Sequence, residues 1–231
     1  MSGLRSEHVK EAAAVVSQYC DMVAIRAFAS LSDKEKDEAE IVLRSFAKYA
    51  SVPIINMESA TAHPLQALAD AITIKEFQPA HKPKVVLSWA PHPKALPHAV
   101  GNSFTKMMKH MDADFIIAHP EGYALNPKIT EGITCTTDQE KAMEGADFVY
   151  TKNWCSYEQY GQILRTDDEW MITPEKMQRT NDGKFMHCLP IRRNIVAADG
   201  VLDSPNALVI QQSQNRIFSA QSVLKQLLEN G

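Results

Sequence analysis

The sequence predicts an α/β fold with mostly parallel sheets, and three features of the chain lead to this prediction. Short apolar runs alternate with amphipathic segments of helical period along the 231 residues. The runs are continuously apolar, as expected of parallel strands that are buried on both faces. No internal repeat or low-complexity tract interrupts the alternation, so the chain consists of successive strand and helix units.

The first half of the chain contains four strands and four helices in this interpretation. Ser32 can cap the second helix by accepting from its first N–H groups. Pro64 suits the first position of the third helix, where a missing N–H costs nothing. The predicted strands span 22–28, 52–57, 84–90 and 114–118, and the predicted helices span 6–20, 33–50, 63–77 and 102–111. The buried face of the first helix is expected to carry Val9, Ala13, Val16 and Cys20.

The second half continues the same alternation. Thr173 and Pro174 have the residue types of a helix cap and a first helical residue, for a helix that runs to about Arg179. The predicted strands span 132–136, 148–151, 185–189 and 207–210, and the other helices span 138–145 and 214–229. The last helix is expected to turn its apolar residues inward: Ile217, Ala220, Val223, Leu224 and Leu227.

Composition narrows the class of protein. Apolar residues make up 45% of the chain, charged residues 23%, and the net charge is −4, which is ordinary for a globular domain and argues against a nucleic-acid partner. The four cysteines form no C-x-x-C pair and no Cys/His cluster of zinc-finger spacing, so we expect no structural zinc and a reducing compartment. No apolar run reaches the ~18 residues of a membrane span, and no secretory signal is visible. We therefore expect a cytoplasmic protein that binds no membrane.

Polar residues follow several of the predicted strands. In open α/β sheets, ligands bind just beyond the carboxyl ends of the strands. Taken singly, such an arginine is usually ion-paired at the surface, such a histidine is usually a cap, and such a cysteine is usually a small buried hydrophobe. Their recurrence favours a site for an anion or a reacting carbonyl, while G-x-G-x-x-G, G-x-x-x-x-G-K-[ST] and G-x-S-x-G are absent. The residues in question are Arg26, Glu58, His63, Gln66, Trp89, His92, Lys152, Asn153, His187, Cys188, Arg192 and Arg193.

Two motifs carry a resemblance to a known family. The segment His63–Asp70, H-P-L-Q-A-L-A-D, is similar to the H-P-x-Q-x-x-x-D motif of aspartate and ornithine carbamoyltransferases, and His187–Pro190 is similar to the H-C-L-P motif of the ornithine branch. Four further segments resemble the N-acetylornithine and N-succinylornithine carbamoyltransferases: Met57–Thr61, Trp89–Pro93, Thr151–Trp154 and Asn215–Arg216. The S-M-G loop that is usual in plain ornithine carbamoyltransferases is absent.

The resemblance implies two Rossmann-like domains with parallel sheets. The Pro/Lys-rich stretch at 78–84 is the expected boundary. Residues 1–77, completed by the C-terminal helix 212–231, correspond to the carbamoyl-phosphate domain, and 78–211 to the N-acylornithine domain. Family members begin with a further segment whose S-x-R-T loop holds phosphate at a helix N-terminus. No S-x-R-T occurs here, so we expect an N-terminally truncated chain whose first domain is incomplete.

The family reaction, by this resemblance, is attack of the δ-amino group of an N-acylornithine on carbamoyl phosphate, which needs no metal and no redox cofactor. The resemblance implies the following contacts. Arg26 would contact the phosphate and the carbonyl oxygen, and its planar fork suits an anion. His63 donates to the carbonyl oxygen, and Gln66 holds the carbamoyl NH₂ from the same helix face. The backbone carbonyls of Cys188 and Leu189 accept from that NH₂, and the Leu189–Pro190 bond is a candidate for the cis form. The remaining implied carbamoyl-phosphate residues are Pro64, Leu65 and Arg216.

On the acceptor side, the resemblance implies that four residues bind the acylornithine: Glu58, His92, Lys152 and Arg192. Lys152 would contact its α-carboxylate. One of Arg192 and Arg193 is expected to make an ordinary ion pair. The position that discriminates acyl groups falls near Ser6, which is small and uncharged, so a succinyl group is favoured over acetyl. The family also implies a homotrimer acting in arginine biosynthesis.

The sequence also allows two alternatives to an active N-acylornithine carbamoyltransferase. A remnant without the phosphate loop could bind acylornithine and catalyse nothing. A carbamoyltransferase that uses ornithine itself is the other alternative.

Overall fold

The computed structural model describes residues 9–230 and confirms an α/β fold with parallel sheets. The strands are β1 Val23–Arg26, β2 Ile54–Glu58, β3 Lys84–Trp89, β4 Asp114–Ala118, β5 Thr134–Thr136, β6 Phe148–Lys152 and β7 Lys184–Met186. The helices are α1 Val9–Val16, α2 Lys34–Ala39, α3 Ile41–Tyr49, α4 Pro64–Phe77, α5 Ala99–Met108, α6 Pro127–Thr130, α7 Gln139–Met143, α8 Pro174–Met177, α9 Asp199–Leu202 and α10 Val209–Asn230.

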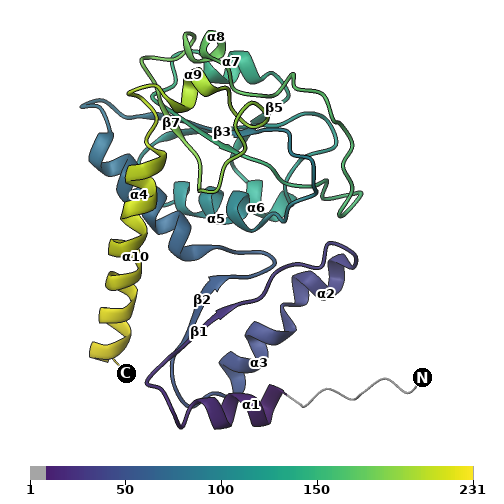
Figure 1. Ribbon diagram of the computed structural model, residues 1–231, viewed down its shortest axis with the longest axis vertical. Coiled ribbons are helices and arrows are strands. Elements are labelled where there is room, and N and C mark those ends of the chain that lie inside the picture. Colours follow the sequence, from purple (N-terminus) through teal and green to yellow (C-terminus); the bar gives the residue numbers. More distant parts are fainter. Residues whose placement is uncertain (1–8, 231) are drawn as a thin grey trace.

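The larger sheet has five parallel strands in the order β5-β4-β3-β6-β7. Helices α7, α8 and α9 lie on one side of it and α4, α5 and α6 on the other (Figure 1). Its central strands β3 and β6 are buried along nearly their whole length, and Leu87, Phe148 and Phe185 form part of one continuous core. This burial on both faces explains why the sequences of these two strands are mainly apolar.

The strand order reverses between β3 and β6. The chain adds β4 and β5 on one side of β3 and then returns to place β6 and β7 on the other side. The register pairs Trp89 with Lys152 at the carboxyl ends of these two strands. A reversal of this kind leaves a crevice beyond the strand ends, where α/β sheets bind ligands.

The smaller sheet pairs β1 with β2 in parallel. Its register ends with Arg26 opposite Glu58, after an irregularity between Ile25 and Arg26. Both charged side chains therefore leave the same end of the sheet. Helices α1, α2 and α3 lie beside this pair of strands (Figure 1).

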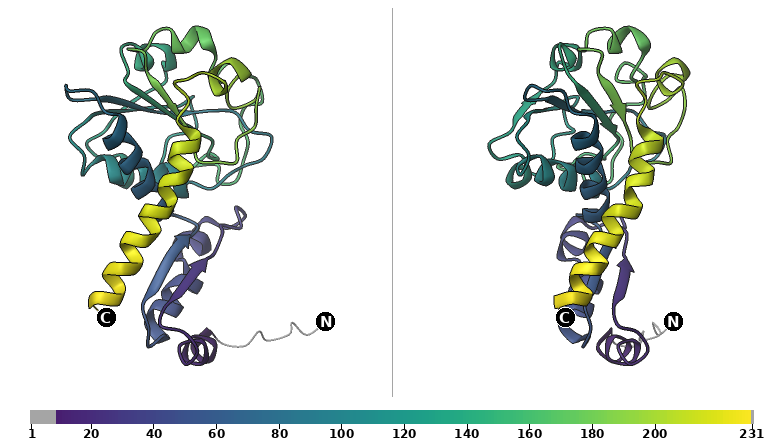
Figure 2. Two further views of the ribbon diagram at one scale, coloured as in Figure 1. Left: turned by 60° about the vertical axis from the view of Figure 1, so that its left-hand side comes forward. Right: turned by 90° about the vertical axis from the view of Figure 1, so that its left-hand side faces the viewer.

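Helix α10 packs along α4 and then extends alongside the part of the molecule that holds β1 and β2 (Figure 2). Its buried face is polar, with Gln212, Asn215 and Ser219 all at most 3% exposed. Asn215 Nδ2 donates to Thr73 Oγ1 at 2.9 Å, and Ser219 Oγ donates to the carbonyl of Leu65 at 2.6 Å. Hydrogen bonds therefore satisfy the polar groups that this contact buries.

Three sequence-based expectations about the elements are wrong, and two short helices were not foreseen. The predicted helix 33–50 is two helices, because Glu40 adopts a left-handed backbone (φ 46°) between α2 and α3. Asp33, and not Ser32, caps α2 by accepting from the N–H of Lys36. The predicted strand 207–210 is a single bridge from Ala207 to Phe185, and helix α10 begins at residue 209. The short helices α6 and α9 were not predicted.

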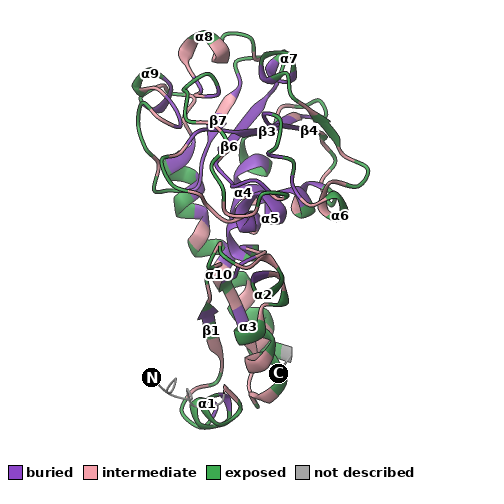
Figure 3. Cartoon of the chain, turned by 90° about the vertical axis from the view of Figure 1, so that its right-hand side faces the viewer, coloured by how far each residue is buried: buried purple, intermediate pink, exposed green. Residues whose placement is uncertain are grey.

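The buried faces of two helices also differ from the predicted ones. On α10, Ile217 and Leu224 are exposed, because the partner helix α4 offers polar groups to that interface. In the first helical segment, Ala13 is buried but Val16 is exposed. Figure 3 shows the exposed surface along α1, α3 and the outer part of α10.

Asp147 ties the amino ends of three chain segments together, and we expect its loss to destabilise the fold. Its carboxylate accepts from the Lys84 N–H, Asn181 Nδ2 and His81 Nε2 at 2.8–3.2 Å. Asp147→Ala should lower the free energy of unfolding in urea by about 2–3 kcal/mol, since it removes several hydrogen bonds to one buried, charged acceptor. The exposed Asp112→Ala should change it by less than about 0.5 kcal/mol.

The difference between Asp147→Ala and the wild type should depend on pH. Burial raises the pKa of Asp147, but hydrogen bonds from Lys84, Asn181 and His81 outweigh it and hold the pKa below its ordinary value. The stabilisation is therefore present above the pKa of the unfolded carboxyl and is lost as the pH falls through the folded value. A cost of Asp147→Ala that grows on acidification would contradict this account.

Candidate active site

A cavity of about 430 Å³ lies beyond the carboxyl ends of β1, β2 and β6. Its lining comes from both sheets, from α4, α5 and α10, from the segment between β3 and α5, and from the loop after β7. The lining residues are Arg26, Phe28, Glu58, His63, Gln66, Leu96, Pro97, Val100, Lys152, Cys188, Leu189, Pro190 and Arg216. The size suits a small-molecule ligand.

Arg26 and Glu58 form an ion pair at the floor of this cavity. Arg26 Nε and Nη2 lie 3.1 and 2.5 Å from Glu58 Oε2. The Arg26 side chain is 54% exposed and its guanidinium lies 4.7 Å from the ring centre of Phe28. Two of the guanidinium nitrogens are thus engaged, while the exposed remainder can meet an anion.

His63 lies at the start of α4, and its imidazole ring is neutral. Its backbone N–H donates to Ser103 Oγ at 2.7 Å, which fixes the helix start against α5. Burial, followed by the charges of Arg216, Arg26 and Lys152, lowers the pKa of His63 to about 3. Its Nε2 lies 3.6 Å from Glu58 Oε2, and its buried Nδ1 has no hydrogen-bond partner among the described residues. A neutral ring with a free nitrogen can donate one hydrogen bond to a ligand oxygen.

Gln66 and Arg216 meet across α4 and α10. Arg216 Nη1 donates to Gln66 Oε1 at 2.7 Å. The buried Arg216 Nε has no partner within residues 9–230. Both side chains line the cavity, so a ligand there meets a carbonyl acceptor and an N–H donor side by side.

The H-C-L-P segment forms another wall. The Leu189–Pro190 peptide is cis, as the resemblance implies. Burial raises the pKa of the Cys188 thiol, with the positive charge of Lys152 acting in the opposite direction. The thiol is therefore protonated at neutral pH and is a poor nucleophile.

The cavity concentrates positive charge in a chain whose net charge is −4. Arg26, Lys152 and Arg216 are cationic and Glu58 is anionic, so the four ionised groups sum to +2 while His63 is neutral. No ion pair joins Lys152 to a carboxylate within the described chain. The site is therefore suited to ligands that carry phosphate or carboxylate groups.

The structure brings together most of the residues that the sequence singled out, but not all of them. Pro64 is exposed, and Leu65 turns into the α4–α10 contact. His92 and Arg192 bind each other outside the cavity lining, with Arg192 Nε 3.2 Å from His92 Nε2. Ser6 lies outside the described residues.

Some residues around the site were not singled out from the sequence. Phe28, Leu96 and Pro97 line the cavity, and no sequence motif signals them. Gln212 accepts from the His187 N–H at 2.9 Å. No spacing in the sequence links these two residues, which lie 25 positions apart.

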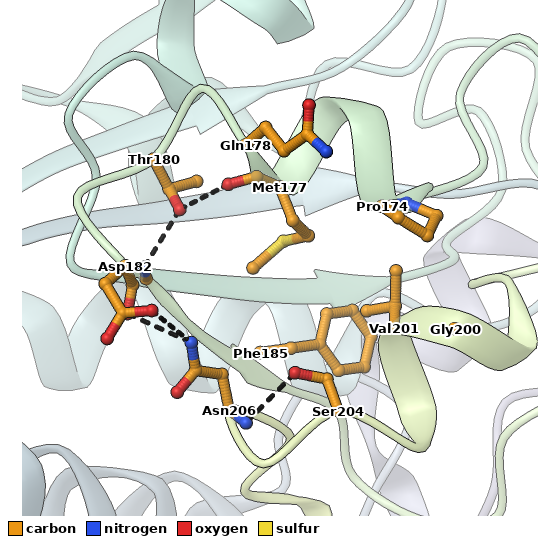
Figure 4. A pocket seen from close by; sticks show the side chains of 11 residues that line it. Pro174, Met177, Gln178, Thr180, Asp182, Phe185, Gly200, Val201, Ser204 and Asn206 are labelled. Carbon is orange, nitrogen blue, oxygen red and sulfur yellow. Dashed lines mark hydrogen bonds between the residues drawn. The ribbon is translucent and has the colours of Figure 1, made fainter.

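A second cavity of about 480 Å³ lies between α8, α9 and the amino end of β7. Its polar groups are engaged with one another: Thr180 with Met177, Asp182 with Asn206, and Asn206 with Ser204 (Figure 4). It lies at the opposite end of β7 from the H-C-L-P segment. The site at the carboxyl ends is therefore the better candidate for catalysis.

Across 9–230 there is no group of three or more His, Cys, Asp or Glu side chains placed to hold a metal ion. Within the same range no helix combines the length and the apolarity that crossing a bilayer requires.

Family models match both parts of the chain. Residues 1–76 match the carbamoyl-P binding domain of aspartate/ornithine carbamoyltransferase, and residues 98–227 match the Asp/Orn binding domain. The chain belongs to the aspartate/ornithine carbamoyltransferase family. In the structure, the first domain of this carbamoyltransferase contributes a two-stranded sheet and the second a five-stranded sheet.

Curated relatives place the carbamoyltransferase in the acylornithine branch. It is 48% identical to the N-succinylornithine carbamoyltransferase of Bacteroides fragilis, over the whole chain and 73% of that enzyme. It is 36% identical to the N-acetylornithine carbamoyltransferase of Xanthomonas axonopodis, over 98% of the chain and 72% of that enzyme.

Solved structures agree with this placement. The carbamoyltransferase superposes on N-acetyl-L-ornithine transcarbamylase with a TM-score of 0.90 and 35% identity, over 98% of this chain and 75% of that one. A crystal structure of acetylornithine transcarbamylase holds acetylcitrulline, at a TM-score of 0.90, 35% identity and coverages of 98% and 74%. A mutant of N-acetyl-L-ornithine transcarbamylase holds carbamyl phosphate and N-succinyl-L-norvaline, at a TM-score of 0.91 with the same identity and coverages.

Proposed function

We propose that this enzyme transfers the carbamoyl group of carbamoyl phosphate to the δ-amino group of an N-acyl-L-ornithine, with N-succinyl-L-ornithine as the preferred acceptor. The observation that carries the proposal is the cavity, where Arg26, Lys152 and Arg216 surround a neutral His63 and the carbonyl of Gln66. Both substrates are anions, and both need positive charge at separate points of one site.

The donor half of the reaction suits the groups around His63. The amine nitrogen forms a bond to the carbonyl carbon, the bond from that carbon to the phosphate oxygen breaks, and the amine proton leaves with the phosphate. Negative charge builds on the carbonyl oxygen during attack, and His63 and Arg26 are the donors proposed to stabilise it. Gln66 Oε1 and the backbone carbonyls of Cys188 and Leu189 are proposed to accept from the carbamoyl NH₂, which orients the donor for attack.

The acceptor half is assigned to the other wall of the cavity. Lys152 supplies the positive charge for the α-carboxylate, and Glu58 faces the same space with its side chain 10% exposed. His92 and Arg192 lie just outside and are joined by a hydrogen bond. They are proposed to reach the acyl group of a longer substrate.

The preference for succinyl over acetyl has two supports. The chain is 48% identical to an enzyme named for N-succinylornithine and 36% identical to one named for N-acetylornithine. The guanidinium of Arg192 keeps two nitrogens beyond its bond to His92, and a succinyl carboxylate is a suitable partner for them.

A panel of three acceptors tests the proposed function. We expect the kcat/KM for N-succinyl-L-ornithine to exceed that for N-acetyl-L-ornithine by about 10-fold or more, since a charged hydrogen bond contributes about 1.5–3 kcal/mol. Ornithine should be the poorest acceptor. Equal use of ornithine would contradict the assignment, and binding of acylornithine without turnover would favour a protein that binds the acceptor alone.

Further properties are proposed on the same basis. Residues 1–77 with 212–231 form the carbamoyl-phosphate side, supported by the bonds of Gln212, Arg216 and Ser219 to α4, and 78–211 form the acceptor side. A homotrimer is proposed, for which exposed apolar residues such as Phe28, Ile41 and Phe218 offer contact surface. A cytoplasmic role in arginine biosynthesis completes the proposal.

A further inference from the structure

Asp70 is a completely buried carboxyl group behind the cavity wall. It has no exposed surface, and it does not line the cavity. Its Oδ1 accepts two hydrogen bonds, from Gln66 Nε2 at 2.7 Å and from Gln212 Nε2 at 2.6 Å. A buried carboxyl group is costly, so this position calls for an explanation.

The chemistry of the acceptor decides which way both glutamines face. A carboxylate oxygen accepts hydrogen bonds and donates none, so each glutamine must turn its NH₂ group toward Asp70. Each side-chain carbonyl then points away from Asp70. A single oxygen atom therefore sets the orientation of two carboxamides.

The two carbonyls turned outward reach opposite parts of the site. Gln66 Oε1 accepts from Arg216 Nη1 at the cavity. Gln212 Oε1 accepts from the backbone N–H of His187, the first residue of the H-C-L-P segment. Asp70 is thus the common point between the α4 wall and the β7 wall of the cavity.

We infer that Asp70 is a positioning residue that holds the Gln66 carbonyl toward the carbamoyl NH₂ and, through Gln212, fixes the H-C-L-P segment that accepts from the same NH₂. The inference deepens the proposed function and rests on it. The i, i+4 spacing of Gln66 and Asp70 on α4 places the two side chains on one helix face.

The role requires an acceptor atom and does not require a charge. Burial raises the pKa of Asp70 to about 7, against the opposing effect of hydrogen bonds from Gln212 and Gln66. Oδ1 accepts both bonds whether or not the other oxygen carries a proton. An amide oxygen at the same place could therefore perform the same task.

Two substitutions of similar shape separate the acceptor from the rest of the side chain. Asp70→Asn keeps an oxygen that can face both glutamines, and we expect kcat to stay within about 5-fold of the wild type. Asp70→Leu has no acceptor and leaves both carboxamides free to turn, and we expect kcat to fall about 100-fold. Equal losses in the two variants would overturn the inference, because charge or packing would then be the role of Asp70.

A double-mutant cycle tests whether Asp70 acts through Gln66. If it does, Asp70→Leu should lower kcat by much less in a Gln66→Ala background than in the wild type. Fully additive losses in kcat would contradict the route through Gln66. If Asp70→Leu does not fold, Gln212→Met removes the bonds of Gln212 to both Asp70 and His187 and leaves the Gln66–Asp70 bond in place. It should lower kcat about 10-fold while urea unfolding stays cooperative, and an unchanged kcat would contradict the role of Gln212.

A spectroscopic readout separates failure of this inference from failure of the proposed function. In ¹⁵N spectra, the side-chain NH₂ protons of Gln66 and Gln212 should exchange slowly with solvent in the wild type and in Asp70→Asn. They should exchange fast in Asp70→Leu. If this exchange pattern is seen but no carbamoyl transfer occurs, the proposed function is refuted and the orienting role of Asp70 stands. If the NH₂ protons exchange fast in the wild type, the orienting role is refuted even when the enzyme is active.

Discussion

Replacing His63 by alanine is expected to lower kcat by about 100-fold or more. The neutral ring offers one N–H to the oxygen on which charge develops, and the loss of one such donor typically costs 10²–10³ in rate. His63→Asn, which keeps an N–H donor, should recover part of the loss. Steady-state assays at saturating substrates measure both variants.

The pH dependence of the wild type adds a check on the role of His63. Burial and the neighbouring positive charges lower the pKa of His63 to about 3, so its ring stays neutral from pH 5 to 9. If the rate of the wild type rises or falls with pH within that range, His63→Asn should show the same rise or fall. If the wild type shows a rate change near pH 6.5 that His63→Asn lacks, His63 works as a titrating acid or base. The exposed His110→Ala serves as the control and should leave kcat unchanged.

Replacing Lys152 by methionine is expected to raise the KM for the acylornithine about 10- to 100-fold. Methionine keeps most of the length of the side chain and removes the charge. A charged hydrogen bond to a carboxylate contributes about 1.5–3 kcal/mol, and if it is equally strong in the ground and transition states its loss appears in KM with little change in kcat. The measurement is the KM for each substrate at a saturating concentration of the other.

The two KM values also test the assignment of Lys152 to the acceptor side. The KM for carbamoyl phosphate should change by less than about 3-fold, because Arg26 and Arg216 are the cations proposed for that substrate. If the KM for carbamoyl phosphate rises instead, Lys152 belongs to the phosphate side. Lys106→Met, at an exposed position of α5, is the matched control for loss of a lysine charge.

The α/β class and most of the cavity could be predicted because both depend on local rules. Continuous apolar runs reveal buried parallel strands, and parallel strands place their carboxyl ends at one edge. Polar residues after these strands, such as Arg26, Glu58 and Lys152, therefore meet in space although they are far apart in the chain. The start of α4 at Pro64 was also predicted by a local rule, the preference for proline at the first helical position.

The features that escaped prediction depend on long-range partners. The inner face of α10 is polar because α4 presents groups such as the Asp70 carboxylate, the Thr73 hydroxyl and the Leu65 carbonyl. Apolar periodicity alone placed Ile217 inward, and the structure exposes it. The junction at Glu40 depends on a left-handed residue between α2 and α3, whose residue type gives no warning of that backbone.

The most direct test of the account is to follow the carbon atom that it says is transferred. The native protein is incubated with carbamoyl phosphate labelled with ¹³C at its carbonyl and with N-succinyl-L-ornithine, and the products are resolved by NMR and mass spectrometry. The account predicts that the label enters a ureido group on the δ-nitrogen, with one phosphate released for each ureido group formed. Label that stays in carbamoyl phosphate or its breakdown products, while the acylornithine binds unchanged, would contradict it.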